Sequence, residues 1–156
     1  MTANPLDEAA APQGSPGRSL TVVVSSVASD SHTWNLVYLQ LALEELGHAV
    51  VNLGACPPDR LLVEQCLEAR PDLVVISTVN GHGFIDGRRL IGRIRAVPEL
   101  ADTPVVIGGM LGIAGPDGKR SHDLLLAAGF TAVFDDGARM PAFRAFLDRL
   151  TAGVAA

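Results

Sequence analysis

Aromatic residues and clusters of basic residues are both scarce in this chain of 156 residues. The sequence holds one Trp, one Tyr and five Phe, which is too few for a platform on which nucleic-acid bases stack. The formal net charge is −5, and no basic patch interrupts the acidic balance. We therefore expect no nucleic-acid partner.

Cysteines are few, and neither a long apolar run nor the pattern of a secretory leader is found in this sequence. The two cysteines, Cys56 and Cys66, do not form the framework of a disulfide-rich secreted domain. Charged residues, glycines or prolines interrupt every apolar stretch before it reaches the length of a membrane span. The first residues contain no basic segment followed by an apolar one. These absences predict a cytoplasmic protein with reduced thiols and no membrane association.

The residues that are present suit one globular domain. Hydrophobic residues make up 48% of the chain, and its length allows a substantial core. Residues 1–18 are rich in Ala, Pro and Gly without periodicity, so we expect a disordered N-terminal tail there. Residues 19–156 are expected to form the single domain.

Short apolar runs alternate with helical patterns along this domain. Buried strands are expected at residues 20–26, 48–53, 73–78, 103–107 and 131–134, and helices at 33–46, 58–69, 85–97, 119–128 and 140–151. Strands joined by helices of this length pair in parallel with right-handed crossovers. The sequence therefore predicts an α/β fold, a flavodoxin-like (Rossmann-like) doubly wound sheet of five parallel strands in the order 2-1-3-4-5.

The first expected helix ends in a clear signal. Apolar side chains recur along it at helical spacing and include Leu46, which predicts that Leu46 faces the core. Gly47 follows and ends the helix through a left-handed cap. His48 comes next and is expected at the surface, near the carboxyl end of the helix.

The predicted strand order also predicts where a ligand binds. Strands one and three lie side by side, and their crossovers leave in opposite directions, so a crevice opens outside their carboxyl ends. Residues 30–32 follow the first strand, Ser77 and Val79 lie at the end of the third, and Gly108 and Gly109 end the fourth. Three loops of mostly small residues are therefore expected to meet at one edge of the sheet.

Asp30 and His32 give this edge its chemistry. A carboxylate bound to one imidazole nitrogen fixes the tautomer and raises the basicity of the other nitrogen, as metal-binding histidines require. His32 alone is equally consistent with a surface residue, and Asp30 shifts the balance toward a ligand. One His and one Asp are too few for a zinc or iron site. A metal that brings most of its own ligands fits, as cobalt does in a corrin ring.

Other ligands of this fold class are less consistent with the sequence. No G-x-G-x-x-G follows the first strand, so a dinucleotide site is weakly supported. A response regulator requires an acidic cluster after the first strand and a phosphoacceptor Asp after the third. Asp30 stands alone, and Ser77 and Thr78 occupy the second position.

Three blocks of the chain carry a resemblance to a known family. The family pattern D-x-H-x-x-G, S-x-L or S-x-V, and G-G is present as Asp30-x-His32-x-x-Asn35, Ser77-x-Val79 and Gly108-Gly109. The chain resembles the cobalamin-binding family that holds its cofactor base-off with histidine on cobalt, and most closely the small (sigma) subunits of glutamate mutases. The likeness covers residues 20–136 and includes residues 51–54, Gly81-x-Gly83 and residues 85–86.

The resemblance implies a cofactor site. His32 would be the lower axial ligand of cobalt, oriented by Asp30, and Ser77 would hydrogen-bond the displaced benzimidazole of the nucleotide tail. The tail would run along the crevice between strands one and three. The candidate cofactor-binding residues are Ser29, Asp30, Ser31, His32, Thr33, Asn35, Ser77, Val79, Asn80, Gly81, Gly83, Gly108, Gly109 and Met110.

The resemblance also implies an activity. The chain would be the adenosylcobalamin-binding component of an isomerase, a carbon-skeleton mutase that interconverts L-glutamate and 3-methylaspartate by radical rearrangement. A large (epsilon-type) barrel subunit would supply the substrate pocket in a heterotetramer, and the small chain would be inactive alone, with no catalytic residue beyond the axial ligand. A stand-alone corrinoid carrier or a cobalamin sensor is the alternative, and a flavin or nucleotide binder of the same fold is a third.

One motif position departs from the family. Asn35 stands where the family has Gly. Asn tolerates a left-handed backbone better than most residues, so a turn that requires one would survive. Its side chain is expected to crowd the nucleotide tail. His82 lies between two glycines of the same edge and is a further candidate contact, whereas Asp86 is explained by the dipole at a helix start.

Overall fold

The computed structural model describes residues 17–112, 117–134 and 139–153. Residues 1–16, which make up most of the expected N-terminal tail, lie outside the described residues. Within the described part, no helix is both long enough and apolar enough to cross a membrane.

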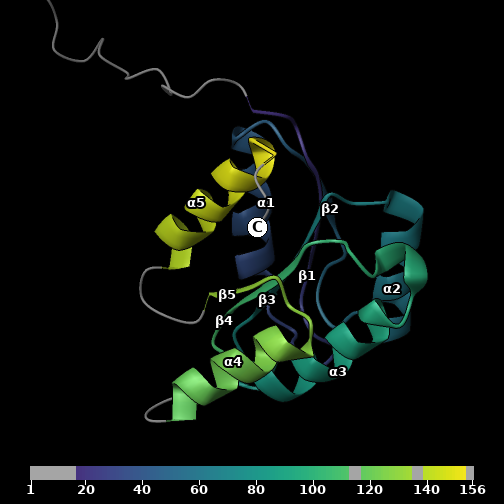
Figure 1. The fold of residues 1–156 in the computed structure, drawn as a ribbon, viewed down its shortest axis with the longest axis vertical. Coiled ribbons are helices and arrows are strands. Elements are labelled where there is room, and N and C mark those ends of the chain that lie inside the picture. Colours follow the sequence, from purple (N-terminus) through teal and green to yellow (C-terminus); the bar gives the residue numbers. More distant parts are fainter. Residues whose placement is uncertain (1–16, 113–116, 135–138, 154–156) are drawn as a thin grey trace, which may run out of the picture.

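Five strands in the described part form one parallel sheet, in the order β2-β1-β3-β4-β5 (Figure 1). The strands are β1 (Thr21–Ser25), β2 (Ala49–Asn52), β3 (Leu73–Thr78), β4 (Val105–Gly109) and β5 (Ala132–Phe134). This order and the alternation of strands with helices confirm the flavodoxin-like fold predicted from the sequence. It also places β1 beside β3, as the expected crevice requires.

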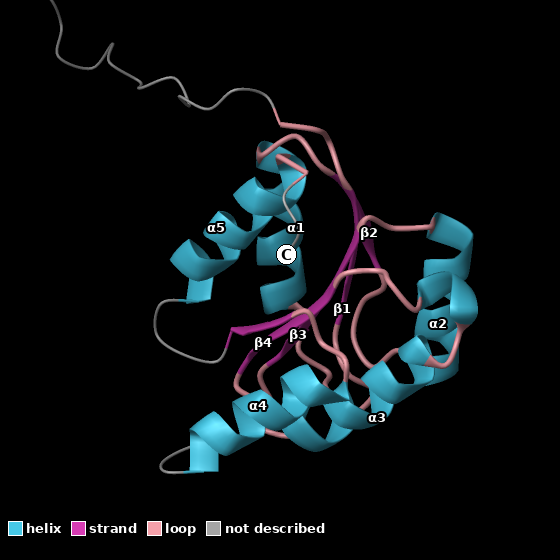
Figure 2. Cartoon of the chain, in the orientation of Figure 1, coloured by secondary structure: helices cyan, strands magenta, loops and turns pink. Residues whose placement is uncertain are grey.

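Helices cover both faces of the sheet. They are α1 (Trp34–Glu45), α2 (Asp59–Ala69), α3 (Gly83–Arg95), α4 (Gly118–Ala128) and α5 (Arg139–Thr151), with a 3-10 turn, η1 (Pro98–Leu100). Figure 2 shows α1 and α5 together on one side of the sheet and α2, α3 and α4 on the other. Each group encloses its own hydrophobic core against the strands. The strand β3 is buried along its whole length, as expected of the central strand.

The end of α1 differs from the expectation at Leu46. Leu36, Leu39 and Leu43 are buried, but Leu46 is 41% exposed. The α-helix ends at Glu45, so Leu46 lies in the cap and no longer continues the inward stripe. Gly47 turns the chain with φ of +90°, which confirms the left-handed cap.

His48 is buried, so the prediction of a surface position is wrong. Its Nδ1 accepts a hydrogen bond of 3.1 Å from the backbone N–H of Leu20. The next residue, Ala49, donates its N–H to the carbonyl of Leu20, so His48 lies against the start of the β1–β2 pairing. Burial lowers the pKa of His48 below its ordinary value, because the charged imidazolium loses its water.

The fourth strand begins at Val105, two residues after its expected start, and includes both glycines at its end. Gly108 and Gly109 are its last residues, and they pair with Ser77 and Thr78 of β3. A Cβ at Gly109 would lie 2.0 Å from the carbonyl oxygen of Thr78, and its φ is +111°. Glycine is therefore required at this position by the neighbouring strand, whatever the site binds.

Candidate functional site

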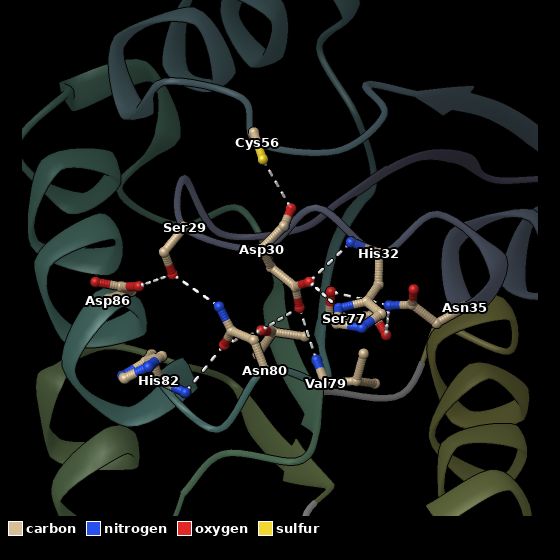
Figure 3. Close-up of polar contacts among 11 residues, drawn as sticks. Ser29, Asp30, His32, Asn35, Cys56, Ser77, Val79, Asn80, His82 and Asp86 are labelled. Carbon is tan, nitrogen blue, oxygen red and sulfur yellow. Dashed lines mark hydrogen bonds and ion pairs between the residues drawn. The ribbon is translucent and has the colours of Figure 1, made fainter.

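The carboxylate of Asp30 joins two loops at the carboxyl edge of the sheet. Its Oδ1 accepts hydrogen bonds from the backbone N–H and the Nδ1 of His32, at 2.9 and 2.7 Å. Its Oδ2 accepts from the Thr78 hydroxyl and from the Val79 N–H, both at 2.7 Å. Figure 3 shows the side chain between the loop that follows β1 and the end of β3. The site thus begins with a carboxylate whose two oxygens are each bound twice.

Asp30 is ionised despite its complete burial. Burial alone would raise its pKa, but the hydrogen bonds from His32, Thr78 and Val79 stabilise the charge and hold the pKa well below its usual range. The peptide carbonyl of Asp30 is bound as well, by the N–H and the thiol of Cys56 at 2.9 and 3.2 Å. The backbone and the side chain of this residue are therefore both fixed.

The bond to Asp30 determines the tautomer of His32. An ionised carboxylate can only accept, so the Nδ1 of His32 carries the hydrogen, and in the neutral ring the lone pair lies on Nε2. The side chain is 59% exposed, and no described residue makes a hydrogen bond to Nε2. The structure therefore presents a single oriented imidazole nitrogen at the edge of the sheet.

Asn35 reaches from α1 to the end of β3. Its Nδ2 donates to the backbone carbonyl of Ser77 at 3.2 Å and to the Ser77 hydroxyl at 2.9 Å (Figure 3). Asn35 is the second residue of α1. Its φ is not positive, since among the described non-glycine residues only Cys56 and Arg70 have positive φ. Asn35 therefore lies in the first turn of the expected helix, and its backbone needs no left-handed conformation.

A hollow of about 280 Å³ lies beside Asn35 and Ser77. It is formed by α1, the ends of β3, β4 and β5, and α5, and its surface is mostly apolar. Five predicted site residues line it: Asn35, Ser77, Val79, Gly108 and Gly109. The sequence reasoning missed its other walls, which include Tyr38, Phe134, Arg139, Met140 and Phe143. The sequence signal that could have indicated these residues is the row of apolar positions on α1 and α5, the two helices that cover this face of the sheet.

The remaining predicted residues lie around the loops of this edge. Ser29 and Asn80 are joined by a hydrogen bond of 2.9 Å, and the Ser29 hydroxyl donates to Asp86. Side chains of Ser31, Thr33 and Met110 are exposed, and Gly81 has positive φ with open space where a Cβ would stand. Gly83 begins α3, where a Cβ would press against Thr78 and Leu111. His82 is exposed beside them.

Asp86 does more than occupy a helix start. Besides Ser29, it pairs with Arg89 at 2.9 Å, and Arg89 also binds Asp59 at 2.7 Å. The hydrogen bond to Asp59 is the main reason that the pKa of Arg89 is raised above its ordinary value. These contacts connect the loop after β1 to α3 and α2. The sequence pattern did not reveal this chain of contacts, because two of its three pairs, Ser29 with Asp86 and Asp59 with Arg89, are 57 and 30 residues apart.

The donor set indicates which kind of metal group could bind. Among the described residues, no group of three or more His, Cys, Asp and Glu side chains could hold a bare metal ion. One oriented imidazole nitrogen suits a metal that arrives with its equatorial ligands already in place. The apolar hollow lined by Asn35, three residues after His32 in the chain, suits a flat ring attached to the same group. Both features fit a corrinoid with a detached nucleotide tail.

Comparisons with known sequences agree with this chemistry. The family model of the B12 binding domain matches residues 20–140. The glutamate mutase sigma subunit of Fusobacterium nucleatum is 27% identical over 116 residues, covering 74% of this chain and 85% of the relative. That of Halobacterium salinarum is 30% identical over 114 residues, covering 73% of this chain and 75% of the relative.

Comparisons with solved structures agree on the fold. A cobalamin-binding protein from Desulfitobacterium hafniense superposes with a TM-score of 0.62 at 20% identity, over 83% of this chain, and this chain spans 59% of that protein. The chemotaxis response regulator CheY4 of Vibrio cholerae gives a TM-score of 0.62 at 16% identity, over 85% of this chain and 99% of the other. A cobalamin-binding protein and a response regulator therefore share this architecture, so the fold alone does not identify the function.

Proposed function

The chain belongs to the B12-binding domain family, and we propose that it holds cobalamin base-off, with His32 as the lower axial ligand of cobalt. The observation that carries the proposal is the pair of Asp30 and His32. Asp30 binds the Nδ1 of His32 at 2.7 Å and leaves Nε2 directed away from it, at an exposed edge of the sheet. An imidazole in this state is ready to ligate a metal.

Asp30 prepares His32 in two ways. Its first oxygen fixes which ring nitrogen of His32 carries the hydrogen, and its second oxygen, bound by Thr78 and Val79, prevents the carboxylate from turning. Because the last residue of β3 and the residue after it supply these two donors, the position of the proposed axial ligand is fixed relative to the sheet. Rotation of His32 away from its bound orientation is thereby limited before any ligand arrives.

The hollow beside Asn35 is the proposed place for the nucleotide tail. Its apolar walls would enclose the benzimidazole ring, and Ser77 would donate a hydrogen bond to the ring nitrogen that has left cobalt. The loops around His32 would contact the corrin through Ser29, Ser31, Thr33, Asn80, Gly81, Gly83 and Met110. Gly108 and Gly109 form the floor where the tail passes the sheet.

The relatives support a role in a mutase. Those compared above are glutamate mutase sigma subunits, so we propose that this chain is the cofactor-binding component of an adenosylcobalamin-dependent carbon-skeleton mutase acting on glutamate. When bound, the cofactor supplies a cobalt–carbon bond whose homolysis starts radical chemistry. The contribution of this chain is to ligate and orient the cofactor. The substrate pocket is assigned to a large barrel subunit, in a heterotetramer.

Absorption spectroscopy tests the cofactor site. The full chain is titrated with cobalamin, and we expect the spectrum of a base-off species with a bound imidazole. His32→Ala should abolish that spectrum, and His122→Ala on α4 should leave it unchanged as the matched control. Unchanged binding and spectrum in His32→Ala would show that another group ligates cobalt.

Activity tests the second half of the proposal. Conversion of glutamate to 3-methylaspartate is assayed with this chain alone, with a large mutase subunit alone and with both. We expect turnover only in the mixture. Turnover by this chain alone would contradict the two-component assignment. Cobalamin binding without turnover in any mixture would instead favour a corrinoid carrier.

A further inference from the structure

Asn35 has a role that its place in the motif does not suggest. Where the family pattern has glycine, this chain places an amide that donates to both the carbonyl and the hydroxyl of Ser77. Ser77 lines the apolar hollow and is itself buried. A side chain that contacts the proposed tail-binding serine is in a position to change what that serine recognises.

The orientation of the Asn35 amide is determined by Ser77. A backbone carbonyl oxygen can only accept, so the Asn35 group that faces it at 3.2 Å must be the nitrogen. The opposite orientation would bring two oxygens together. The observed orientation leaves the Asn35 Oδ1 buried without a hydrogen-bond partner among the described residues. An amide that keeps this orientation despite an unpaired oxygen is held there by the two contacts to Ser77.

The amide in turn determines what the Ser77 hydroxyl can offer. The oxygen of the hydroxyl accepts from Asn35 Nδ2 at 2.9 Å, so one of its lone pairs is occupied. No described residue accepts a hydrogen bond from this hydroxyl, so its hydrogen remains available. Next to a mostly apolar hollow, Ser77 is thus prepared as a donor.

We propose that Asn35 is a positioning residue that makes Ser77 a directed donor, so that the site selects corrinoids whose lower base carries an unprotonated ring nitrogen. Benzimidazoles and purines have such a nitrogen, whereas a phenolic base such as p-cresol is a smaller aromatic ring without one. The proposal rests on cobalamin binding with the tail in this hollow. A purely steric effect of Asn35 would instead weaken the binding of every corrinoid to the same extent, whatever its lower base.

The test compares two corrinoids on four proteins. Dissociation constants of cobalamin and of p-cresolylcobamide are measured by absorption titration for the wild type, Ser77→Ala, Asn35→Asp and Asn35→Gly. The quantity of interest is the ratio of the two constants within each protein. Because the cost of detaching benzimidazole from cobalt is the same for every protein, it cancels when ratios are compared between variants.

The ratio of the two dissociation constants should favour cobalamin about fivefold more strongly in the wild type than in Ser77→Ala. A difference of this size is the effect of one hydrogen bond. Asn35→Asp should remove that preference, because its carboxylate accepts the Ser77 hydrogen instead of leaving it for the base. Asn35→Gly should reduce the preference, because the hydroxyl is then free to turn. A merely structural role would change both constants together and leave the ratio unchanged.

Three results separate this inference from the function on which it rests. If neither corrinoid binds with the base-off, histidine-bound spectrum, the proposed function fails. If both bind and the ratio is the same in the wild type and Asn35→Asp, the role of Asn35 is contradicted while the function stands. If Asn35→Gly tightens both corrinoids equally, Asn35 only crowds the tail and the inference is wrong.

Discussion

The carboxylate of Asp30 accepts a hydrogen bond of 2.7 Å from the backbone N–H of Val79, a residue 49 positions later in the chain. This bond ties the loop after β1 to the end of β3 at the place where the strand order of the sheet reverses. The same carboxylate holds the Nδ1 of His32. The orientation of the candidate metal ligand and the closure of the sheet edge therefore depend on one buried charge.

Asp30→Asn should destabilise the protein. The amide nitrogen of the new side chain would face groups that now donate hydrogen bonds to the carboxylate. At least one buried donor would therefore lose its hydrogen-bond partner. We expect a decrease of about 2–4 kcal/mol in the free energy of unfolding, measured by urea denaturation. Asp123→Asn on the exposed face of α4 is the control. Equal unfolding midpoints in the two variants would show that the network around Asp30 contributes little.

The stabilising effect of Asp30 should disappear in acid. Its pKa is lower in the folded protein than the ordinary value of about 4, so the unfolded chain binds the proton more readily. The contribution is complete above about pH 4 and decreases as the pH falls below it. Urea denaturation between pH 5 and pH 3 should therefore show a steeper loss of stability in the wild type than in Asp30→Asn. Parallel curves would contradict this.

His48 should make stability depend on pH in a different range. Because burial lowers its pKa, protonation favours the unfolded chain, and stability should decrease as the pH falls below the ordinary value of 6.5. His48→Asn places an amide oxygen near the position of Nδ1, where it can still accept from Leu20, and cannot become charged. Thermal unfolding between pH 7.5 and pH 5 should show a smaller decrease for this variant. The exposed His82→Asn serves as the comparison.

Two glycines should respond oppositely to alanine. In Gly109→Ala the new methyl group would meet the carbonyl of Thr78 in a backbone with positive φ, and we expect a loss of at least about 2 kcal/mol in unfolding free energy. Gly92 lies in α3 with open space around its Cα, so Gly92→Ala should stabilise by roughly 0.5–1 kcal/mol. Denaturation of both variants measures the difference, and a neutral Gly109→Ala would contradict the close approach.

The elements that the sequence predicted most accurately have strong local signals. A helix was expected at residues 58–69 and is found at Asp59–Ala69, and the strand expected at 73–78 is found with those bounds. Pro58 precedes this helix, and residues 71–72 separate it from an uninterrupted apolar run. The pairing of Asp30 with His32 was also predictable, because the two residues are neighbours in the chain and their chemistry is complementary.

The features that escaped prediction depend on residues far apart in sequence. Asn35 was expected as an obstacle to the tail, and its bonds to Ser77 became visible only when α1 was placed beside β3. His48 was predicted at the surface because it follows the glycine that ends a helix, and its partner, Leu20, is 28 residues away in the chain. The donors that bind the second oxygen of Asp30 come from the end of β3. Tertiary contacts, rather than local patterns, decide the environment of each of these side chains.

Electron paramagnetic resonance of bound cob(II)alamin tests the axial ligand most directly. The unpaired electron couples to the axial nitrogen, and a ¹⁴N ligand splits each line into a triplet whereas a ¹⁵N ligand splits it into a doublet. The wild-type chain is labelled with ¹⁵N-histidine and loaded with unlabelled cobalamin. If His32 ligates cobalt, the labelled protein gives doublets and the unlabelled protein gives triplets. Triplets in the labelled protein would show that the benzimidazole of the cofactor remains on cobalt, and would contradict the assignment of His32.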